Sequence, residues 1–260
     1  MDPWQIAVVI AFTSAGATVH ASVGIGIGLV AGPALVAVDP GFLPGPVIMV
    51  TLILTARHLI VDGHHADRGT VQRAYIGVPF GLALGFVVVA VADEATMRIV
   101  IGCAIVIAAA LLLLGVHVSR SARTDVLGGG AFALSLIAAG IPGPAAAVAF
   151  NDLPPTRYRG TMGFVGIPVG IVSLALLTFA GEFGSHELEL TAWMIPGIGV
   201  GLLAGRYLRP HLDNAWFRTS VLWLALLGGA ALVIRGDPAL SQSEQDAQSH
   251  QVGDVTPGGR

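Results

Sequence analysis

The sequence has no lysine, a single cysteine and few charged residues of either sign. Charged residues make up 11% of the chain and hydrophobic residues 54%, and the mean hydropathy is +0.79. This composition excludes a water-soluble globular protein and is typical of a polytopic membrane protein. Because Cys103 has no second cysteine, a disulfide or a cysteine-based zinc site within one chain is excluded as well. All 13 basic residues are arginine.

Hydrophobic runs of bilayer-crossing length fill most of the chain. Six of them approach the roughly 20 residues that a membrane-spanning helix needs. They lie at residues 44–61, 74–92, 97–118, 160–180, 191–208 and 216–234. Two further apolar runs, 6–38 and 126–150, are interrupted by glycine and proline. The polar segment 236–260 has too few apolar residues to form a core, and we expect it to be a disordered tail.

The two interrupted runs place glycine and proline where a helix tolerates them poorly. Gly24, Gly26 and Gly28 alternate with apolar residues ahead of Pro33, and the second run contains the segment from Gly140 to Pro144. Each glycine costs a helix roughly 1 kcal/mol and each proline roughly 3 kcal/mol relative to alanine, so we expect both runs to break there. Close helix packing is the alternative interpretation of such glycines. Two breaks at matching positions instead favour the substrate site of a secondary transporter, because irregular backbone within a membrane must line a cavity or be buried in protein.

The arginines discriminate between two topologies. If each interrupted run crosses the membrane once, the arginines ahead of the tail divide six against six. If each run enters and leaves on the same side, ten share one side and only Arg98 and Arg235 lie opposite. Because cytoplasmic loops collect arginine, the second topology is favoured. As a helix the second run would be about 37 Å long, enough for two half-crossings, whereas the first would be about 54 Å, which leaves half or full crossings open.

This topology divides the chain into two similar halves, residues 1–124 and 125–235. Each half is a glycine-broken helical hairpin, re-entrant or split, followed by three transmembrane helices, and the halves have opposite orientations. If the hairpin is counted as the first element of each half, the third element, at 74–92 or 191–208, carries glycines at four-residue spacing. We call it the third helix of that half. The predicted fold class is therefore an all-α polytopic membrane protein with two inverted repeats, an architecture that supports alternating access around a midplane site.

Polar residues near the breaks are the candidates for binding an anion. Backbone amides of the broken segments would donate hydrogen bonds, and half-helix N-termini would add positive potential. Hydroxyls such as those of Ser14, Thr18 and Ser135 more often bond a carbonyl of their own helix. His20 is a candidate for both substrate contact and a coupled proton, since ionisable groups at membrane depth usually face a cavity or a partner. The substrate-binding candidates are His20, Ser22, Gly24, Gly26, Gly28, Thr51, Arg57, Gly140, Pro142, Gly143 and Thr161.

A second polar group lies in the segment 62–67, which contains Asp62, His64, His65 and Asp67. These residue types bind metals, but adjacent histidines on a loop rarely converge on one ion. We interpret the segment as a solvated cytoplasmic loop and expect no metal or other cofactor.

The order of these motifs resembles the TauE/SafE sulfite exporter family. The resemblance rests on the glycine-rich break closed by Pro33, the break from Gly140 to Pro144, the sequence Arg159-Gly160-Thr161 and the glycine-spaced third helix, and it covers roughly residues 6–235. It implies a secondary carrier of small sulfur-containing oxyanions such as sulfite, sulfoacetate or other organosulfonates. A proton, another coupling ion or the membrane potential would drive it.

Other functions fit the sequence less well. An anion channel needs a continuous polar lining, and a membrane-embedded enzyme needs a paired aspartate, a histidine-rich metal box or a serine nucleophile motif, which these runs lack. A non-transport bundle would not need two matched breaks. We expect a transporter in the inner cell membrane, with a small anion and the lipid bilayer as partners and no nucleic acid. The sequence leaves the direction of transport, the coupling ion and the oligomeric state open.

Overall fold

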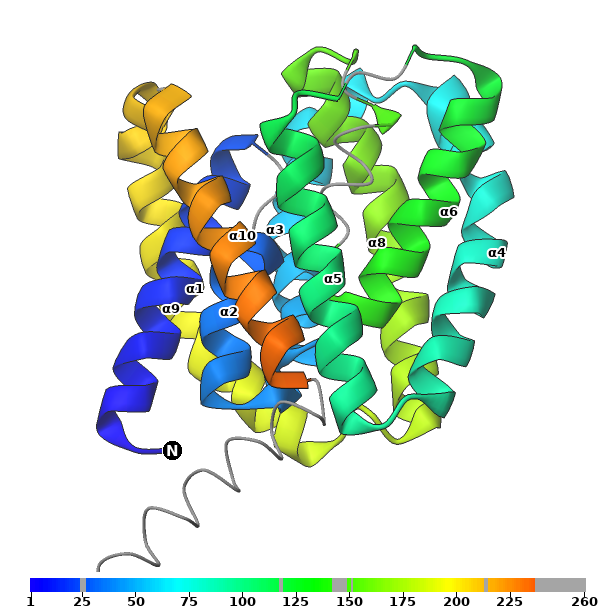
Figure 1. Cartoon of the computed structure of the whole chain (residues 1–260). Coiled ribbons are helices and arrows are strands. Elements are labelled where there is room, and N and C mark those ends of the chain that lie inside the picture. Colours follow the sequence, from blue (N-terminus) through cyan, green and yellow to red (C-terminus); the bar gives the residue numbers. More distant parts are fainter. Residues whose placement is uncertain (24–26, 117–118, 142–148, 151, 213–214, 237–260) are drawn as a thin grey trace, which may run out of the picture.

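The structure, a computed structural model, describes residues 1–23, 27–116, 119–141, 149–150, 152–212 and 215–236. These residues form helices and short connections, and no strand occurs among them (Figure 1). The helices are α1 (Pro3–Val23), α2 (Ile27–Val38), α3 (Gly45–Asp62), α4 (Arg68–Val91), α5 (Glu94–Leu113), α6 (Ala122–Ala139), α8 (Pro155–Ala180), α9 (Ser185–Leu212) and α10 (Ala215–Gly236), with 3-10 turns η1 (Pro40–Phe42) and η2 (Gly63–His65).

Six helices of the described chain are long and apolar enough to cross a membrane. They include α3, α4, α5, α8 and α9, which correspond to predicted spans, and also α1 from the first interrupted run. The last predicted span, 216–234, falls within α10. The prediction of an all-helical, multi-pass membrane protein is therefore confirmed. The predicted disordered tail lies outside the described residues, apart from the end of α10 at Gly236.

Several helices begin before their apolar runs, because capping rather than hydropathy fixes where a helix starts. Asp67 accepts a hydrogen bond from the Thr70 backbone N–H at 2.9 Å and starts α4 ahead of its apolar run. Asp93 does the same for α5 through Thr96, also at 2.9 Å. A side-chain acceptor at this position satisfies a backbone donor that the helix leaves free. Each helix thus extends past its apolar part into a polar end.

The first interrupted run forms a hairpin of unequal arms. α1 is about 32 Å long and α2 about 18 Å, and α2 runs back beside α1 in the opposite direction (Figure 1). Gly28, Gly32 and Pro33 lie inside α2, although the sequence predicted a break extending to the proline. Burial explains the difference, since a side-chain atom on Gly228 of α10 would approach Pro33 Cβ to 2.5 Å. Tight packing around α2 therefore offsets the poor helix propensity of these residues.

The second interrupted run breaks at Gly140, as predicted. This glycine follows α6 with a φ of 65°, a left-handed conformation that favours glycine. Its N–H donates to the Leu136 carbonyl at 2.8 Å, and the next residue, Ile141, donates to the Ser135 carbonyl at 3.2 Å. These two bonds close the helix end. Residues 142–148, which include the rest of the predicted break, lie outside the described residues.

The arginines gather at one end of the molecule, the upper end in Figure 1. Among the arginines of the described residues, only Arg98, in the first turns of α5, and Arg235, at the end of α10, belong to helix ends at the opposite side. This is the ten-against-two distribution expected from the sequence. The acidic turns at 92–94 and 181–184 and the N-terminus lie at the lower end. The arginine-rich end holds Arg57, Arg68, Arg73, Arg120, Arg123, Arg157, Arg159, Arg206, Arg209 and Arg218.

Glycine-lined contacts lock the hairpin of each half to the third helix of the other half. α4 lies along α6, where a Cβ on Gly77 would stand 1.9 Å from the Val126 carbonyl oxygen. α9 lies along α1, where a Cβ on Gly201 would stand 2.5 Å from the Ser14 oxygen. Such close backbone approach is how helices associate in lipid. The two predicted halves are therefore interlocked rather than side by side.

The buried apolar residues form two clusters. The first cluster joins α1, α2, α5, α9 and α10 and the second joins α4, α6 and α8, and we call these helix groups the first and second bundles. Helix α3 lies between them, since its Val47, Val50 and Leu54 belong to the first cluster and its Ile48 to the second. The boundary between the bundles therefore passes along α3.

The glycine contact between α4 and α6 is testable with Gly81→Leu. A Cβ at Gly81 would lie 2.0 Å from the Gly130 carbonyl oxygen, so the helices must separate, and we expect a loss of at least about 1–3 kcal/mol of stability. Gly199→Leu is the matched control, because no atom lies within 4 Å of its Cβ position. Thermal melting of both detergent-purified variants measures the difference. Equal melting temperatures would contradict this account of the interface.

The orientation is testable with single cysteines in a Cys103→Ala background. Glu182→Cys lies in the exposed turn between α8 and α9, and His64→Cys lies in exposed η2 at the arginine-rich end. Because arginine-rich ends face the cytoplasm, we expect an impermeant thiol reagent to label the first in intact cells and the second only after permeabilisation. The reverse pattern would show that the arginine-rich end faces outward.

Candidate functional site

The described ends of the two interrupted runs meet inside the protein. Gly28, in the first turn of α2, lies against Gly140, so that a Cβ on Gly28 would be 2.9 Å from the Gly140 carbonyl oxygen. A Cβ on Gly140 would in turn lie 3.1 Å from the Pro44 oxygen and 3.5 Å from Val47 Cβ. We call this contact of Gly28, Gly140 and Val47 the break junction. It joins the first bundle to the end of α6, where Ala139 and Ile141 pack in the first cluster and the preceding Leu136 and Ile137 pack in the second.

Helix α3 carries a buried stripe away from the break junction. Val47, Thr51, Thr55, His58 and Asp62 are all buried, and their spacing puts them on one face of the helix. We call these residues the α3 stripe. The Thr55 methyl group would lie 3.3 Å from a Cβ on Gly166 of α8. The stripe thus changes from apolar at the junction to ionisable at the arginine-rich end.

Two histidines from different helices stack within the bundle interior. The rings of His20, from α1, and His58, from α3, have centroids 5.5 Å apart and an interplanar angle of 23°. His20 is 4% exposed and His58 is 2% exposed. None of their four ring nitrogens has a hydrogen-bond partner among the described residues. The sequence predicted His20 as a site residue, and the structure brings His58 to it.

Two threonine hydroxyls near the histidines are also buried without a partner in the described chain. They belong to Thr51, in the α3 stripe, and Thr13, which faces Gly197 of α9. Burying a hydroxyl without a hydrogen bond costs roughly 1–3 kcal/mol by protein mutational data. Such groups are few in native proteins and each calls for an explanation, of which a bound polar ligand is one. The other hydroxyls near the breaks, those of Ser14, Thr18 and Ser135, donate to carbonyls four residues earlier.

The arginine-rich end of the α3 stripe is closed by a buried ion pair. Arg159 Nε of α8 lies 2.6 Å from Asp62 Oδ2, and both residues are less than a tenth exposed. The helices approach closely here, because a Cβ on Gly160 would stand 2.3 Å from the Asp62 carbonyl oxygen. Thr161 accepts a hydrogen bond from the Asp67 backbone N–H at 3.0 Å. The sequence Arg159-Gly160-Thr161 therefore fastens the start of α8 to the end of α3.

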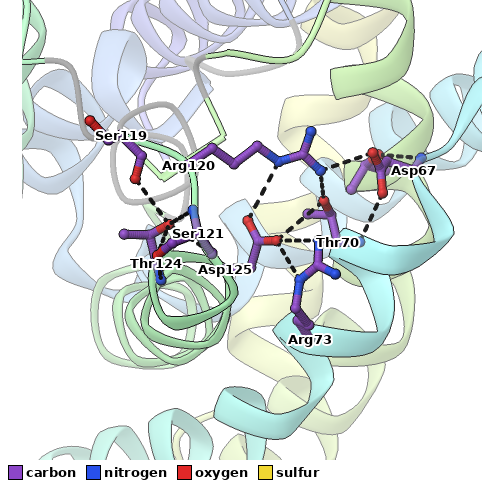
Figure 2. Close-up of polar contacts among 9 residues, drawn as sticks. Asp67, Thr70, Arg73, Ser119, Arg120, Ser121, Thr124 and Asp125 are labelled. Carbon is purple, nitrogen blue, oxygen red and sulfur yellow. Dashed lines mark hydrogen bonds and ion pairs between the residues drawn. The ribbon is translucent and has the colours of Figure 1, made fainter.

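A second ionic network joins α4 to α6 at the same end (Figure 2). The buried Asp125 carboxylate pairs with Arg73 at 2.7 Å and lies 3.9 Å from Arg120. Arg120 also pairs with Asp67 at 2.9 Å and donates to Thr70. The network crosses from the loop before α4 to the start of α6. It holds together the helices whose glycine faces are in contact further along.

The opposite, acidic end contains a cavity of about 330 Å³. Its lining includes Asp39, Asp93, Arg98, Glu187 and His186. His186 Nε2 lies 3.1 Å from Asp39 Oδ2, which ties the start of α9 to the end of α2. This hollow lies between the ends of α2, α4 and α8 and the starts of α5 and α9.

The structure brings some predicted site residues together and leaves others apart. His20, Gly28, Thr51 and Gly140 are buried near the boundary between the bundles. Arg57 is exposed near the end of α3, and Thr161 is engaged with the loop before α4. The side chain of Ser22 lies outside the described part of α1. Gly24, Gly26, Pro142 and Gly143 also lie outside the described residues.

A family profile supplies the comparison with known proteins. The profile described as sulfite exporter TauE/SafE matches residues 8–232, nearly all of the membrane portion. The chain belongs to the sulfite exporter TauE/SafE family. The resemblance seen in the sequence is thereby confirmed, and it places the chain among membrane transporters. No curated protein and no solved structure matches the chain.

Sequence reasoning missed two residues that the structure places in this family member's interior. His58 was not among the candidates, and Asp62 was assigned to a solvated loop. Both lie on the face of α3 that carries Thr51 and Thr55. Helical spacing from Thr51 would have shown this, because residues 51, 55, 58 and 62 repeat at intervals of three and four. Nothing in the sequence paired Asp62 with Arg159.

The network of Figure 2 predicts a specific acid sensitivity. The hydrogen bond from Arg120, aided by the Thr70 N–H, lowers the pKa of Asp67 to about 2. A depressed carboxyl pKa stabilises the fold above its ordinary value of about 4, and this contribution is lost as the pH falls from about 4 to about 2. We expect Asp67→Asn, which keeps the helix cap, to lower the melting temperature at pH 6. A difference from the unmodified chain that stays constant down to pH 2.5 would contradict this.

Proposed function

We propose that this chain is a secondary carrier that exports small sulfur-containing oxyanions across the inner membrane by alternating access. Sulfite, sulfoacetate and other organosulfonates are the expected substrates. The observation that carries the proposal is the meeting of Gly28 and Gly140 at the end of α6, where this helix passes from the second buried cluster into the first. Movement of one bundle against the other would open the boundary between them to each side in turn.

The chemistry of the break junction suits a weakly held anion. The N-terminus of α2 begins at Ile27, where the first backbone N–H groups have no partner within the helix and the helix dipole is positive. The Thr51 hydroxyl adds a donor on the facing helix. The buried Arg159 is already paired with Asp62 and so adds little net charge. An anion held mainly by neutral donors can also leave, as a carrier requires.

The packing pattern supports two inverted repeats as the basis of this mechanism. The hairpin helix α1 packs on α9 of the other half as α6 packs on α4. α3 packs on its counterpart α8, and α5 packs on its counterpart α10. A two-fold axis in the membrane plane would exchange the α1–α9 pair with the α6–α4 pair. It would map the α3–α8 pair and the α5–α10 pair each onto itself. In this proposal residues 1–124 and 125–235 are the repeats, and each supplies one break.

The orientation assigns a role to each end of the carrier. The arginine-rich end would face the cytoplasm, where the Asp62–Arg159 pair closes the path along α3. The acidic end would face outward, and its cavity of about 330 Å³ would form part of the exit. Arg98 in that cavity would draw the anion past the surrounding carboxylates.

The test compares two glycines one turn apart on α2. A methyl group at Gly28 would press on the Gly140 carbonyl at 2.9 Å, whereas one at Gly32 would make ordinary contacts at 3.6 Å and 3.8 Å. We expect Gly28→Ala to reduce 35S-sulfite flux in proteoliposomes by at least about tenfold and Gly32→Ala to stay within about twofold of the unmodified chain. Melting temperatures of both variants control for unfolding.

The substrate class is tested on the unmodified chain. A ligand that binds only the folded state raises the melting temperature, so purified protein can be screened against sulfite, sulfoacetate, thiosulfate, taurine and sulfate. We expect a rise with the sulfur oxyanions that are also transported. Unchanged melting with all five anions, together with no protein-dependent sulfite flux, would overturn the proposed function.

A further inference from the structure

The His20–His58 pair combines burial with an absence of partners. Each residue is at least 96% buried, the two rings stack at 5.5 Å, and no ring nitrogen of the pair makes a hydrogen bond of normal geometry within the described chain, the His20 backbone being the polar group that the His58 ring faces. A histidine with a purely structural role is normally fixed by a hydrogen bond that selects its tautomer. The buried carboxylates of Asp62 and Asp125, by contrast, are both paired with arginine. The histidine pair thus shares with the buried Tyr158 hydroxyl the absence of a hydrogen-bond partner in the described chain, and of these groups only the histidines have an ordinary pKa near neutral pH.

The surroundings of the pair carry a net positive charge, with two arginines against one carboxylate. The charged groups that act on His58 are Asp62 and Arg57 of α3 and Arg159 of α8, and the charged group that acts on His20 is His58 itself. α2 has no ionisable residue, and on α9 Arg206 follows the glycines that pack on α1, with its side chain outside the described residues. Because Asp62 is bound to Arg159, no nearby carboxylate is free to stabilise a proton on the pair.

An arriving anion would change this balance. The pair lies on the same face of α3 as the break junction but about 16 Å further along the helix, since His58 follows Val47 by 11 residues, and its members come from α1 of the first bundle and from α3. The anion therefore reaches the pair on its way along the α3 stripe. A bound anion would supply the negative charge that stabilises an imidazolium in a buried site. Two imidazolium rings stacked at 5.5 Å would repel each other strongly at low dielectric, so the pair accommodates one added proton.

We propose that the His20–His58 pair binds one proton together with the transported anion, so that the two cross the membrane in the same direction. The inference rests on the proposed function. On anion binding, a proton from the water on that side adds to the lone pair of a ring nitrogen. On anion release, the proton leaves to the water on the other side and the ring returns to its neutral form. Both rings are needed, because the neutral ring accepts or stacks against the charged one.

The experiment measures the ratio of protons to anions in proteoliposomes. The anions are 35S-labelled sulfite and thiosulfate, since thiosulfate carries no proton of its own at neutral pH, and a trapped pH dye follows proton movement. A potassium gradient with valinomycin fixes the membrane potential. Protein-free vesicles correct for passage of sulfur dioxide. We expect the unmodified chain to move about one proton per anion, and His58→Asn and His20→Asn to lower this ratio at least about fivefold.

His65→Asn is the matched control. His65 also contacts another histidine ring, that of His64, with centroids 3.8 Å apart and a tilt of 44°, but both are exposed in η2 at the arginine-rich end. We expect it to keep the ratio of the unmodified chain. The double variant of His20 and His58 should match either single variant, because the pair holds one proton.

Two results overturn the inference in distinguishable ways. Anion flux through the unmodified chain without protein-dependent proton movement, or an unaltered ratio in folded His58→Asn, would refute coupling by the pair and leave the carrier in place. No protein-dependent flux of either anion would remove the proposed function and this inference with it. The readout is the number of protons moved per anion. A variant that only transports less anion keeps this ratio and is not mistaken for an uncoupled one.

Discussion

Direct backbone contact between helices is the constraint on which this structure depends. In lipid, burial of apolar side chains gives helices little reason to associate, so close packing must supply the attraction. Backbone carbonyl oxygens of α6 come so close to Gly77 and Gly81 that the Cβ of any other residue would collide with them. Carbonyl oxygens of α1 approach Gly197 and Gly201 in the same way. These contacts fix α4 to α6 and α9 to α1. Helix α3, which contributes to both buried clusters, lies along the boundary between the bundles.

The placement of polar groups follows from the same solvent. Most arginines lie at helix ends, where they reach water or pair with carboxylates such as Asp67 and Asp125. Among the described residues, His20, His58, Asp62 and Arg159 are buried on or beside the α3 stripe, and Asp125 is buried in the network between α4 and α6. A membrane protein bears the cost of such groups chiefly where they act on a substrate or an ion. Helix α3 therefore lies at the boundary between the bundles and also carries buried ionisable residues of the candidate site.

The sequence predicted the helices, their directions and one break well, because these follow from local composition. Apolar length located α3, α5 and α10, and the left-handed Gly140 ended α6 as expected. It failed for Pro33, because burial against α10 outweighs helix propensity there. It also failed for His58 and Asp62, whose role depends on which helices face them. Contacts such as Asp62–Arg159 join residues 97 positions apart, and local pattern carries no information about such pairs.

The two ends of the α3 stripe are closed to different degrees, which bears on how the protein works. At the arginine-rich end, Asp62 and Arg159 form a buried pair at 2.6 Å, and α8 touches the α3 backbone beside it through Gly160. Separating such a pair leaves two buried charges without partners, which costs several kcal/mol unless water reaches them. At the acidic end, the exposed His186–Asp39 pair at 3.1 Å borders a cavity already present. Exposed pairs contribute little, so this end opens at lower cost. In the described structure the arginine-rich end of the α3 stripe is therefore held together more strongly than the acidic end.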